Sequence, residues 1–177
     1  MSGLEQLRAL LREGGGLMAS LLAPDGEPCQ AACSDSPALL AAEGPRAEGR
    51  REQYELLMEA IYEGYLLHYG APRVVLVPEA DLRLLAGDRL YAIGLARLVA
   101  LGDTEAVAEL ADTITLSALA QGAEDRPLAE AVWVAGAHAV GWGSSELHAH
   151  AKALVHEGSP QAFEAMRTSV VGVPASP

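Results

Sequence analysis

The chain has 177 residues, half of them hydrophobic, which is enough for one ordinary domain with a substantial core. Its 24 acidic and 12 basic residues give a formal net charge of −12, so a nucleic acid or an anionic membrane surface would repel it. No apolar run reaches the roughly 20 residues of a membrane span, because even residues 131–145 form a shorter run that contains His138. We therefore expect no nucleic acid partner and no membrane span.

Residues 1–45 are predicted to form a loosely organised N-terminal segment. The opening "MSGLEQLRALLREGGG" is typical of an amphipathic helix that ends at three glycines, and the stretches "APDGEP" and "SDSP" then interrupt short helical pieces. The opening also lacks the basic start, apolar core and small-residue cleavage site of a secretory signal. We therefore expect a cytoplasmic location.

The two cysteines, Cys29 and Cys33, occur in this segment as "CQAAC". Their spacing fits neither a redox pair with two intervening residues nor half of a four-ligand zinc site, because the chain has no second cysteine cluster. Pro24, Pro28 and Pro37 surround them and favour a loop. We interpret both cysteines as ordinary reduced thiols.

Residues 46–177 are predicted to form one helical bundle domain, which makes the fold class all-α. Breaks that contain glycine or proline separate the predicted helices. Helices are expected at 47–69, 79–101, 103–121, 127–142, 145–156 and 160–169. The nearest strand candidate is "RVVLVP", residues 73–78, and we interpret it as a connector because two prolines and two helices flank it.

Four of the five tyrosines lie on the helix predicted at 47–69. At about 100° per residue, one face of this helix collects Tyr54, Met58, Tyr62, Tyr65 and Tyr69. Tyrosine combines a large contact area with a polar tip. The stripe is therefore core packing, a subunit interface, or the wall of an apolar pocket.

A row of glutamates occupies the neighbouring face of the same helix. Glu55, Glu59 and Glu63 follow one another at four-residue spacing, so they share one side of the helix. We interpret this row as a face in contact with solvent rather than as a metal site.

Residues 84–103, "LLAGDRLYAIGLARLVALGD", predict a buried helix, because apolar residues surround almost its whole circumference. Gly87 and Gly94 would let a neighbouring backbone approach closely, which offsets a cost of about 1 kcal/mol per helical glycine. Asp88 is expected to be structural. Arg83, on the same helix, is expected to contribute little to stability.

The end of this helix carries its own stop signal. Gly102 can adopt the left-handed conformation that closes a helix. Asp103 follows it and can cap the next helix. Two helices are therefore predicted to meet at "LGD".

Within residues 79–121, an "LLAGD" helix, an "LGD" break and a helix with "LADTI" follow in this order. This segment resembles one in the trans-prenyl diphosphate synthases of the all-α isoprenoid synthase superfamily, and the resemblance covers a minor part of the chain. It implies isoprenoid-synthase-like helical packing. In that family the segment is a structural helix pair beside the active site.

The family's catalytic residues are missing from the matching positions. Those enzymes hold Mg²⁺ against a diphosphate with two aspartate-rich motifs, because Mg²⁺ prefers oxygen ligands. Where the first motif is expected, residues 67–73 read "LHYGAPR", and the chain has no adjacent pair of aspartates. Diphosphate also needs several cationic donors, and Lys152 is the only lysine. The resemblance therefore implies a noncatalytic relative without a cofactor, and Mg²⁺ would be required only if the chain were an enzyme.

The segment "ELHAH" offers one further candidate, a metal site. Glu146 and His150 lie one helical turn apart, an arrangement that can ligate a metal in a bundle. A di-iron bundle needs two such motifs with further inward glutamates, and the sequence has one. We therefore interpret the histidines of this segment, including His148, as a polar helix face.

Together these observations predict a noncatalytic accessory or assembly subunit related to polyprenyl diphosphate synthases, acting by association with a like or unlike helical subunit. One alternative is a prenyl transferase whose carboxylates come from unusual positions or from a partner chain. Another is a binding module for a small prenyl-type apolar ligand.

Overall fold

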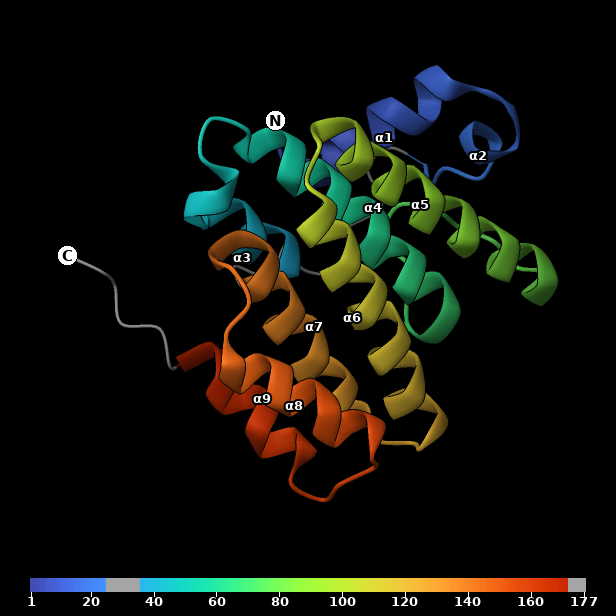
Figure 1. Ribbon diagram of the computed structural model, residues 1–177. Coiled ribbons are helices and arrows are strands. Elements are labelled where there is room, and N and C mark those ends of the chain that lie inside the picture. The colour runs from blue at the N-terminus through green and yellow to red at the C-terminus, as the bar shows by residue number, and fades with distance from the viewer. Residues whose placement is uncertain (25–35, 172–177) are drawn as a thin grey trace.

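The computed structural model describes residues 1–24 and 36–171, and in this part of the chain the fold is all-α, as the sequence predicts (Figure 1). The described helices are α1 (Gly3–Gly14), α2 (Gly16–Ser20), α3 (Pro37–Glu43), η1 (Pro45–Ala47), α4 (Arg51–Tyr69), α5 (Ala80–Leu101), α6 (Thr104–Gly122), α7 (Arg126–Trp142), α8 (Glu146–His156) and α9 (Ala162–Val171). The predicted connector 73–78 contributes only an isolated antiparallel bridge between Leu22 and Val75.

The six long predicted helices correspond to α4–α9, and the largest difference lies at the start of α4. The sequence places that start at residue 47, whereas α4 begins at Arg51. Pro45–Ala47 form a separate 3-10 turn, and Gly49 follows with a φ of 74°. A left-handed residue interrupts the helix there, so residues 47–50 cannot belong to α4.

The described parts of the N-terminal segment form short helices that pack on the bundle. Ser2 and Glu5 form a capping box at the start of α1, and Leu7 and Leu11 of α1 are buried. α3 packs against both α4 and α7 through small side chains such as Ala41, which is fully buried. Cys29 and Cys33 lie outside the described residues.

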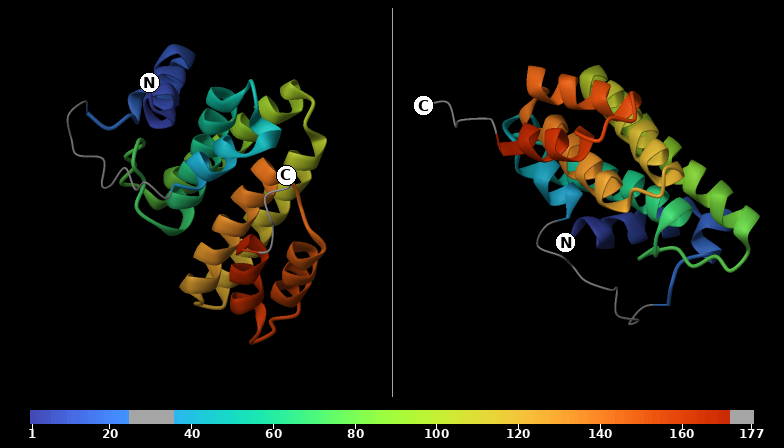
Figure 2. Two further views of the ribbon diagram at one scale, coloured as in Figure 1. Left: turned by 90° about the vertical axis from the view of Figure 1, so that its left-hand side faces the viewer. Right: turned by 90° about the horizontal axis from the view of Figure 1, so that it is seen from below.

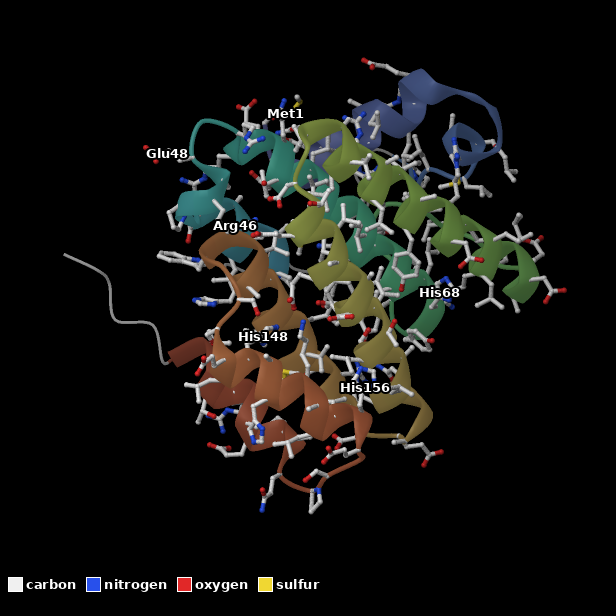
Figure 3. The ribbon with its side chains drawn as sticks, in the orientation of Figure 1. Met1, Arg46, Glu48, His68, His148 and His156 are labelled. Carbon is white, nitrogen blue, oxygen red and sulfur yellow. The ribbon has the colours of Figure 1, made fainter. Side chains whose placement is uncertain are left out.

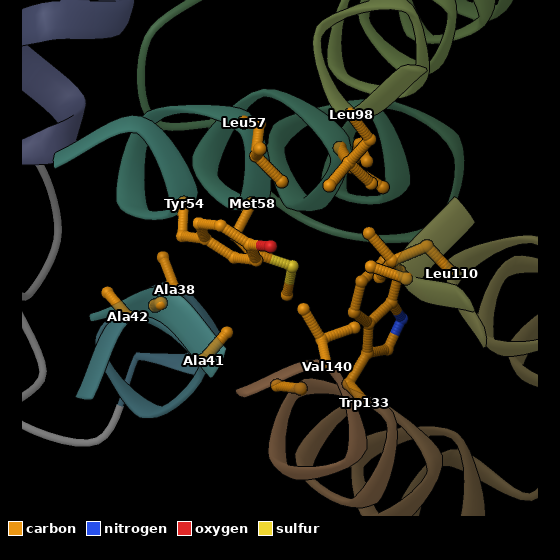
Figure 4. Packing of buried hydrophobic residues seen from close by; sticks show 14 of the residues in the cluster. Ala38, Ala41, Ala42, Tyr54, Leu57, Met58, Leu98, Leu110, Trp133 and Val140 are labelled. Atoms are coloured by element: carbon orange, nitrogen blue, oxygen red, sulfur yellow. The ribbon is translucent and has the colours of Figure 1, made fainter. Parts of the chain in front are cut away.

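Three hydrophobic clusters follow one another along the bundle. The first joins α1, α4 and α5, the second joins α3, α4 and α7 with parts of α5 and α6, and the third joins α6–α9. α4 belongs to two of them and runs through the middle of the molecule (Figures 1 and 2). Around its N-terminal half, the middle cluster packs Tyr54 and Met58 of α4 against Trp133 and Val140 of α7 (Figure 4).

α4 and α5 form the closest helix pair, and glycines lie at their contact. A Cβ atom placed on Gly94 would lie 2.9 Å from the carbonyl oxygen of Leu57, and one on Gly87 would lie 3.0 Å from that of Gly64. Such distances leave no room for a side chain. The two glycines that the sequence predicts at a close helix contact therefore lie where two backbones meet.

The outer side of α5 contradicts the prediction of a helix buried all round. Its buried residues are Ala86, Gly87, Leu90, Gly94 and Leu98, which all face α4 and its neighbours. Leu85 is 65% exposed and Val99 is 62% exposed. The helix is apolar around most of its circumference, but α5 lies at the edge of the bundle, where no element among the described residues covers its outer side.

The structure gives Arg83 several hydrogen-bond partners that the sequence does not reveal. Its guanidinium donates hydrogen bonds to the carbonyl oxygens of Leu67 (2.6 Å), Leu66 (3.3 Å) and Gly70 (2.5 Å). These carbonyls belong to the C-terminal turn of α4, where helix carbonyls lack partners within the helix. Arg83 therefore ties α5 to the end of α4.

The break between α5 and α6 has the predicted geometry. Gly102 has a φ of 76°, and the Asp103 carboxylate accepts from the backbone N–H of Ala106 at 3.0 Å. Asp103 also accepts from the Tyr54 hydroxyl and pairs with Arg46 at 2.8 Å. Burial and the bond to Asp103 raise the pKa of Tyr54 to about 12. Burial alone would raise the pKa of Asp103, but these partners outweigh it and lower that pKa.

Among the described residues, no helix combines the length and the hydropathy needed to cross a bilayer.

The glycine contact between α4 and α5 gives a first prediction. Gly94→Ala should lower the free energy of unfolding by about 1 to 3 kcal/mol, because the added methyl group would overpack the contact. Gly122→Ala makes the same chemical change on α6 at a position with no neighbouring atom within 4 Å, and it should change stability little. Urea unfolding of the three proteins measures both effects. Equally small changes would mean that α4 and α5 are not in backbone contact.

Candidate functional site

The tyrosine stripe of α4 divides between the core and the surface. Tyr54 and Met58 are fully buried, and Tyr65 is 5% exposed. Tyr62 is half-buried, and Tyr69, at the end of α4, is 44% exposed. Most of the stripe therefore serves as core packing, which leaves Tyr69 and the edge of Tyr62 as its surface.

Trp133 of α7 completes the aromatic cluster. Its ring lies 5.1 Å from the Tyr62 ring and 5.0 Å from the Tyr65 ring. Gln121 of α6 donates to the Tyr65 hydroxyl at 2.7 Å. The stripe thus joins α4 to α7 by aromatic contacts, which add to the burial of apolar area, and to α6 by a hydrogen bond.

Two of the three glutamates of the α4 row are buried, contrary to the prediction of a face in contact with solvent, and Glu55 is half-buried. Glu63 is fully buried and Glu59 is 4% exposed. The Glu63 carboxylate accepts backbone N–H bonds from Arg73 (2.7 Å), Val74 (2.6 Å) and Val75 (3.2 Å). The connector 70–79 folds over this carboxylate and supplies donors that helical periodicity does not reveal.

Arg73 neutralises much of the buried negative charge. Its guanidinium pairs with Glu59 at 2.6 Å and with Glu63 at 3.2 Å, and it lies 5.2 Å from the centre of the Tyr62 ring. Burial nevertheless raises the pKa of Glu59, against the opposing effect of Arg73. At the other end of the row, Glu55 accepts from the backbone N–H of Gly3 at 2.7 Å. The row therefore fastens other segments to α4.

The histidines of α8 also differ from the predicted polar face. Glu146 and His150, the candidate metal ligands, are both exposed, whereas His148 is 4% exposed. In Figure 3 the labelled histidines lie at separate places, His68 on α4 and His148 and His156 on α8. Within residues 1–24 and 36–171, no three His, Cys, Asp or Glu side chains are grouped as metal ligands would be.

His148 belongs to a buried ion-pair network between α6 and α8. Its Nε2 lies 2.6 Å from Oε1 of Glu109, and Lys152 pairs with Glu109 at 2.9 Å and with Asp112 at 2.7 Å. Burial by itself raises the pKa of Glu109, but the bonds and charges of His148 and Lys152 outweigh it and hold that pKa below its usual value.

Ser169 adds a hydroxyl to this network without making it a catalytic triad. Its Oγ lies 3.5 Å from Nδ1 of His148, so serine, histidine and glutamate follow one another as in serine hydrolases. The hydroxyl donates instead to the carbonyl of Met166 at 2.8 Å, and Ser169 is 3% exposed. A buried hydroxyl with this partner is not placed to attack a substrate, so the network stabilises the contact between α6, α8 and α9.

A groove between α1, α2 and α5 is an open site among the described residues. We call it the α1–α5 groove; it has a volume of about 440 Å³, within the range of small-molecule sites. Apolar residues, glycines and two arginines line it. They are Leu10, Leu11, Gly14, Gly15, Met18, Arg89, Ala92, Ile93, Ala96, Arg97 and Ala100.

A second surface lies beside the groove on α5. Leu84, Leu85 and Val99 are exposed there, and Leu95 between them is half-buried. We call these four residues the α5 face. Leu85, Ala92 and Val99 recur at seven-residue intervals, the spacing by which paired helices contact one another.

Comparison with known proteins finds no matching family model, and it finds no significant match among curated proteins or solved structures.

The buried network of Glu109 gives a second prediction. Glu109→Gln should lower the free energy of unfolding by about 1 to 3 kcal/mol near neutral pH, because His148 and Lys152 lose a charged partner. The lowered folded-state pKa of Glu109 means that its stabilisation is complete above the unfolded pKa of about 4.3 and disappears as the pH falls through the folded value. The stability difference from wild type should therefore shrink as the pH falls below about 4.3.

Urea unfolding across this pH range measures the difference. Glu130→Gln is the matched control, because Glu130 is an exposed carboxylate that pairs with Arg126 at 3.6 Å on the surface, where ion pairs contribute little. A pH-independent loss in Glu109→Gln would contradict the charged role of Glu109.

Proposed function

We propose that this chain is a noncatalytic helical subunit and that a second copy of the chain binds it through the α5 face. The observation that carries the proposal is the exposure of Leu84, Leu85 and Val99 on a single helix of 22 residues. A helix of this length is about 33 Å long. Two helices of this length that pack side by side are long enough to bury the area of a specific interface, about 1,200 to 2,000 Å².

The chemistry of the α5 face favours a helical partner. Its large residues are aliphatic, and Asp88 is the charged residue that the heptad spacing places within the stripe. One copy carries a formal charge of −12, so two copies repel each other at long range. Burial of apolar area is then the favourable term in association, because it does not depend on opposite charges.

The resemblance to trans-prenyl diphosphate synthases supports the same proposal. In that family, enzymes associate through long helices near the resembling segment, and some pair a catalytic chain with a small noncatalytic one. Here α5 and α6 carry the resembling residues, and α5 has the exposed face. We include isoprenoid-synthase-like packing of α4–α9 in the proposal.

The third prediction concerns association itself. The purified chain should form a dimer at micromolar concentration by light scattering, and Leu85→Glu with Val99→Glu should dissociate it by placing charges in the interface. Leu119→Glu with Leu147→Glu is the matched control, since both leucines are exposed on other helices. The tyrosines are poor test residues, because Tyr65 is buried and its removal would damage the core.

A wild-type chain that stays monomeric throughout the micromolar range would contradict the proposal. So would a dimer that both double variants affect equally, because the contact would then lie elsewhere. Circular dichroism of each variant checks that its helices remain folded.

The fourth prediction concerns salt. Raising the ionic strength from about 0.01 M to about 1 M shortens the screening length from about 30 Å to about 3 Å. Repulsion between two copies of charge −12 should weaken, so the dissociation constant of the dimer should fall. Sedimentation equilibrium at several salt concentrations measures it. An interface held by ion pairs would weaken instead.

A further inference from the structure

The α1–α5 groove has an apolar wall of a kind that accommodates an alkyl chain. Leu10 and Met18 line one side, and Ile93 and Ala96 line the other. The α5 wall extends from residue 89 to residue 100, which is about 17 Å along a helix axis. Gly15 gives the chain a left-handed turn between α1 and α2, with a φ of 62°, and a Cβ atom there would meet nothing within 4 Å. The groove therefore stays open at that turn.

Two arginines, Arg89 and Arg97, line the same groove. Neither makes an ion pair or a hydrogen bond with any residue that the structure describes, and both are exposed. The lining contains no acidic residue. In a chain of net charge −12, two uncompensated positive charges beside an apolar wall form a local site for an anion.

We propose that the α1–α5 groove binds a single-chain amphiphile with an anionic head. The alkyl chain lies against Leu10, Met18, Ile93 and Ala96, where its transfer from water is favourable. A carboxylate or phosphate head interacts with Arg89 and Arg97, because the guanidinium group matches the geometry of both anions. This inference does not depend on the association of two copies, since Arg89, Arg97 and the groove residues Ile93 and Ala96 are not part of the α5 face.

The direct test is displacement of a fluorescent fatty acid, cis-parinaric acid, from the full chain below the micelle concentration. Tetradecanoate and tetradecyl phosphate should displace it at micromolar concentration. Tetradecanol has the same chain without the charge, and it should bind at least about tenfold more weakly. Inorganic phosphate, which has the charge without the chain, should not displace the probe.

Variants then locate the bound molecule. Arg89→Gln with Arg97→Gln should weaken tetradecanoate binding about tenfold or more and leave tetradecanol unchanged, because only the charged head loses its partners. Arg126→Gln with Arg167→Gln removes the same net charge from α7 and α9 and should have little effect. Ala96→Phe fills the groove and should weaken both amphiphiles, whereas Ala149→Phe on the exposed face of α8 should weaken neither.

Several results would overturn the proposal. They are the absence of displacement in the wild type, equal affinity for tetradecanoate and tetradecanol, an equal loss in the two arginine pairs, and full binding by Ala96→Phe. Co-sedimentation with anionic phosphatidylglycerol vesicles in place of binding to the free amphiphile would also overturn it, because the ligand would then be a bilayer. Thermal unfolding of each variant shows whether a loss of binding reflects a loss of fold.

The test also separates this proposal from the association of two copies. Leu84→Glu with Val99→Glu should abolish the dimer and leave amphiphile binding intact, because neither position lies three or four residues from Arg89 or Arg97 and neither lines the groove. A monomeric chain that binds tetradecanoate would contradict only the proposal that two copies associate. A dimer that does not bind the amphiphile would contradict only the proposal of a ligand in the groove.

Discussion

The arrangement around α4 depends on one buried group, the carboxylate of Glu63. A buried carboxylate is costly unless its lone pairs and its charge are satisfied. Glu63 accepts three backbone N–H bonds from residues 73–75 and pairs with Arg73, which also pairs with Glu59. The connector is thereby fixed against α4, and α5 begins a few residues later. Glu55, two turns earlier, holds the start of α1 through Gly3. The same row of glutamates therefore fixes both walls of the α1–α5 groove.

Helix positions could be predicted from the sequence because their signals are local. Gly102 with Asp103 ends α5 and begins α6 in the predicted way, and small residues mark the contact between α4 and α5. The environment of each face could not be predicted in this way. Four-residue spacing places Glu59 and Glu63 on one side of α4, but it does not show that a connector covers them. Likewise, the apolar circumference of α5 does not reveal that its outer side lacks a neighbour.

The candidate site was harder to predict than the fold, because residues from distant parts of the chain form it. The tyrosines attract attention as a single sequence pattern, yet Tyr54 and Tyr65 lie in the core. The groove combines Leu10 and Met18 with residues 89–100, and no spacing rule joins these segments. Its one sequence signal is weak: Arg89 and Arg97 lie eight residues apart on an acidic chain, and only the structure shows that they have no partner among the described residues.

α5 connects the two proposed activities through its geometry. One side is fixed to α4 by glycine contacts and by Arg83, one side carries Leu85 and Val99, and a third lines the groove. Ala92 belongs to both the heptad stripe and the groove wall. A ligand or a partner that shifts α5 therefore acts on both surfaces, and any resulting coupling must be equal in both directions. The size of this coupling is limited by how firmly α5 is held against α4. That depends on the contacts between the two helices, whose alignment Glu63 and the connector 70–79 help to fix.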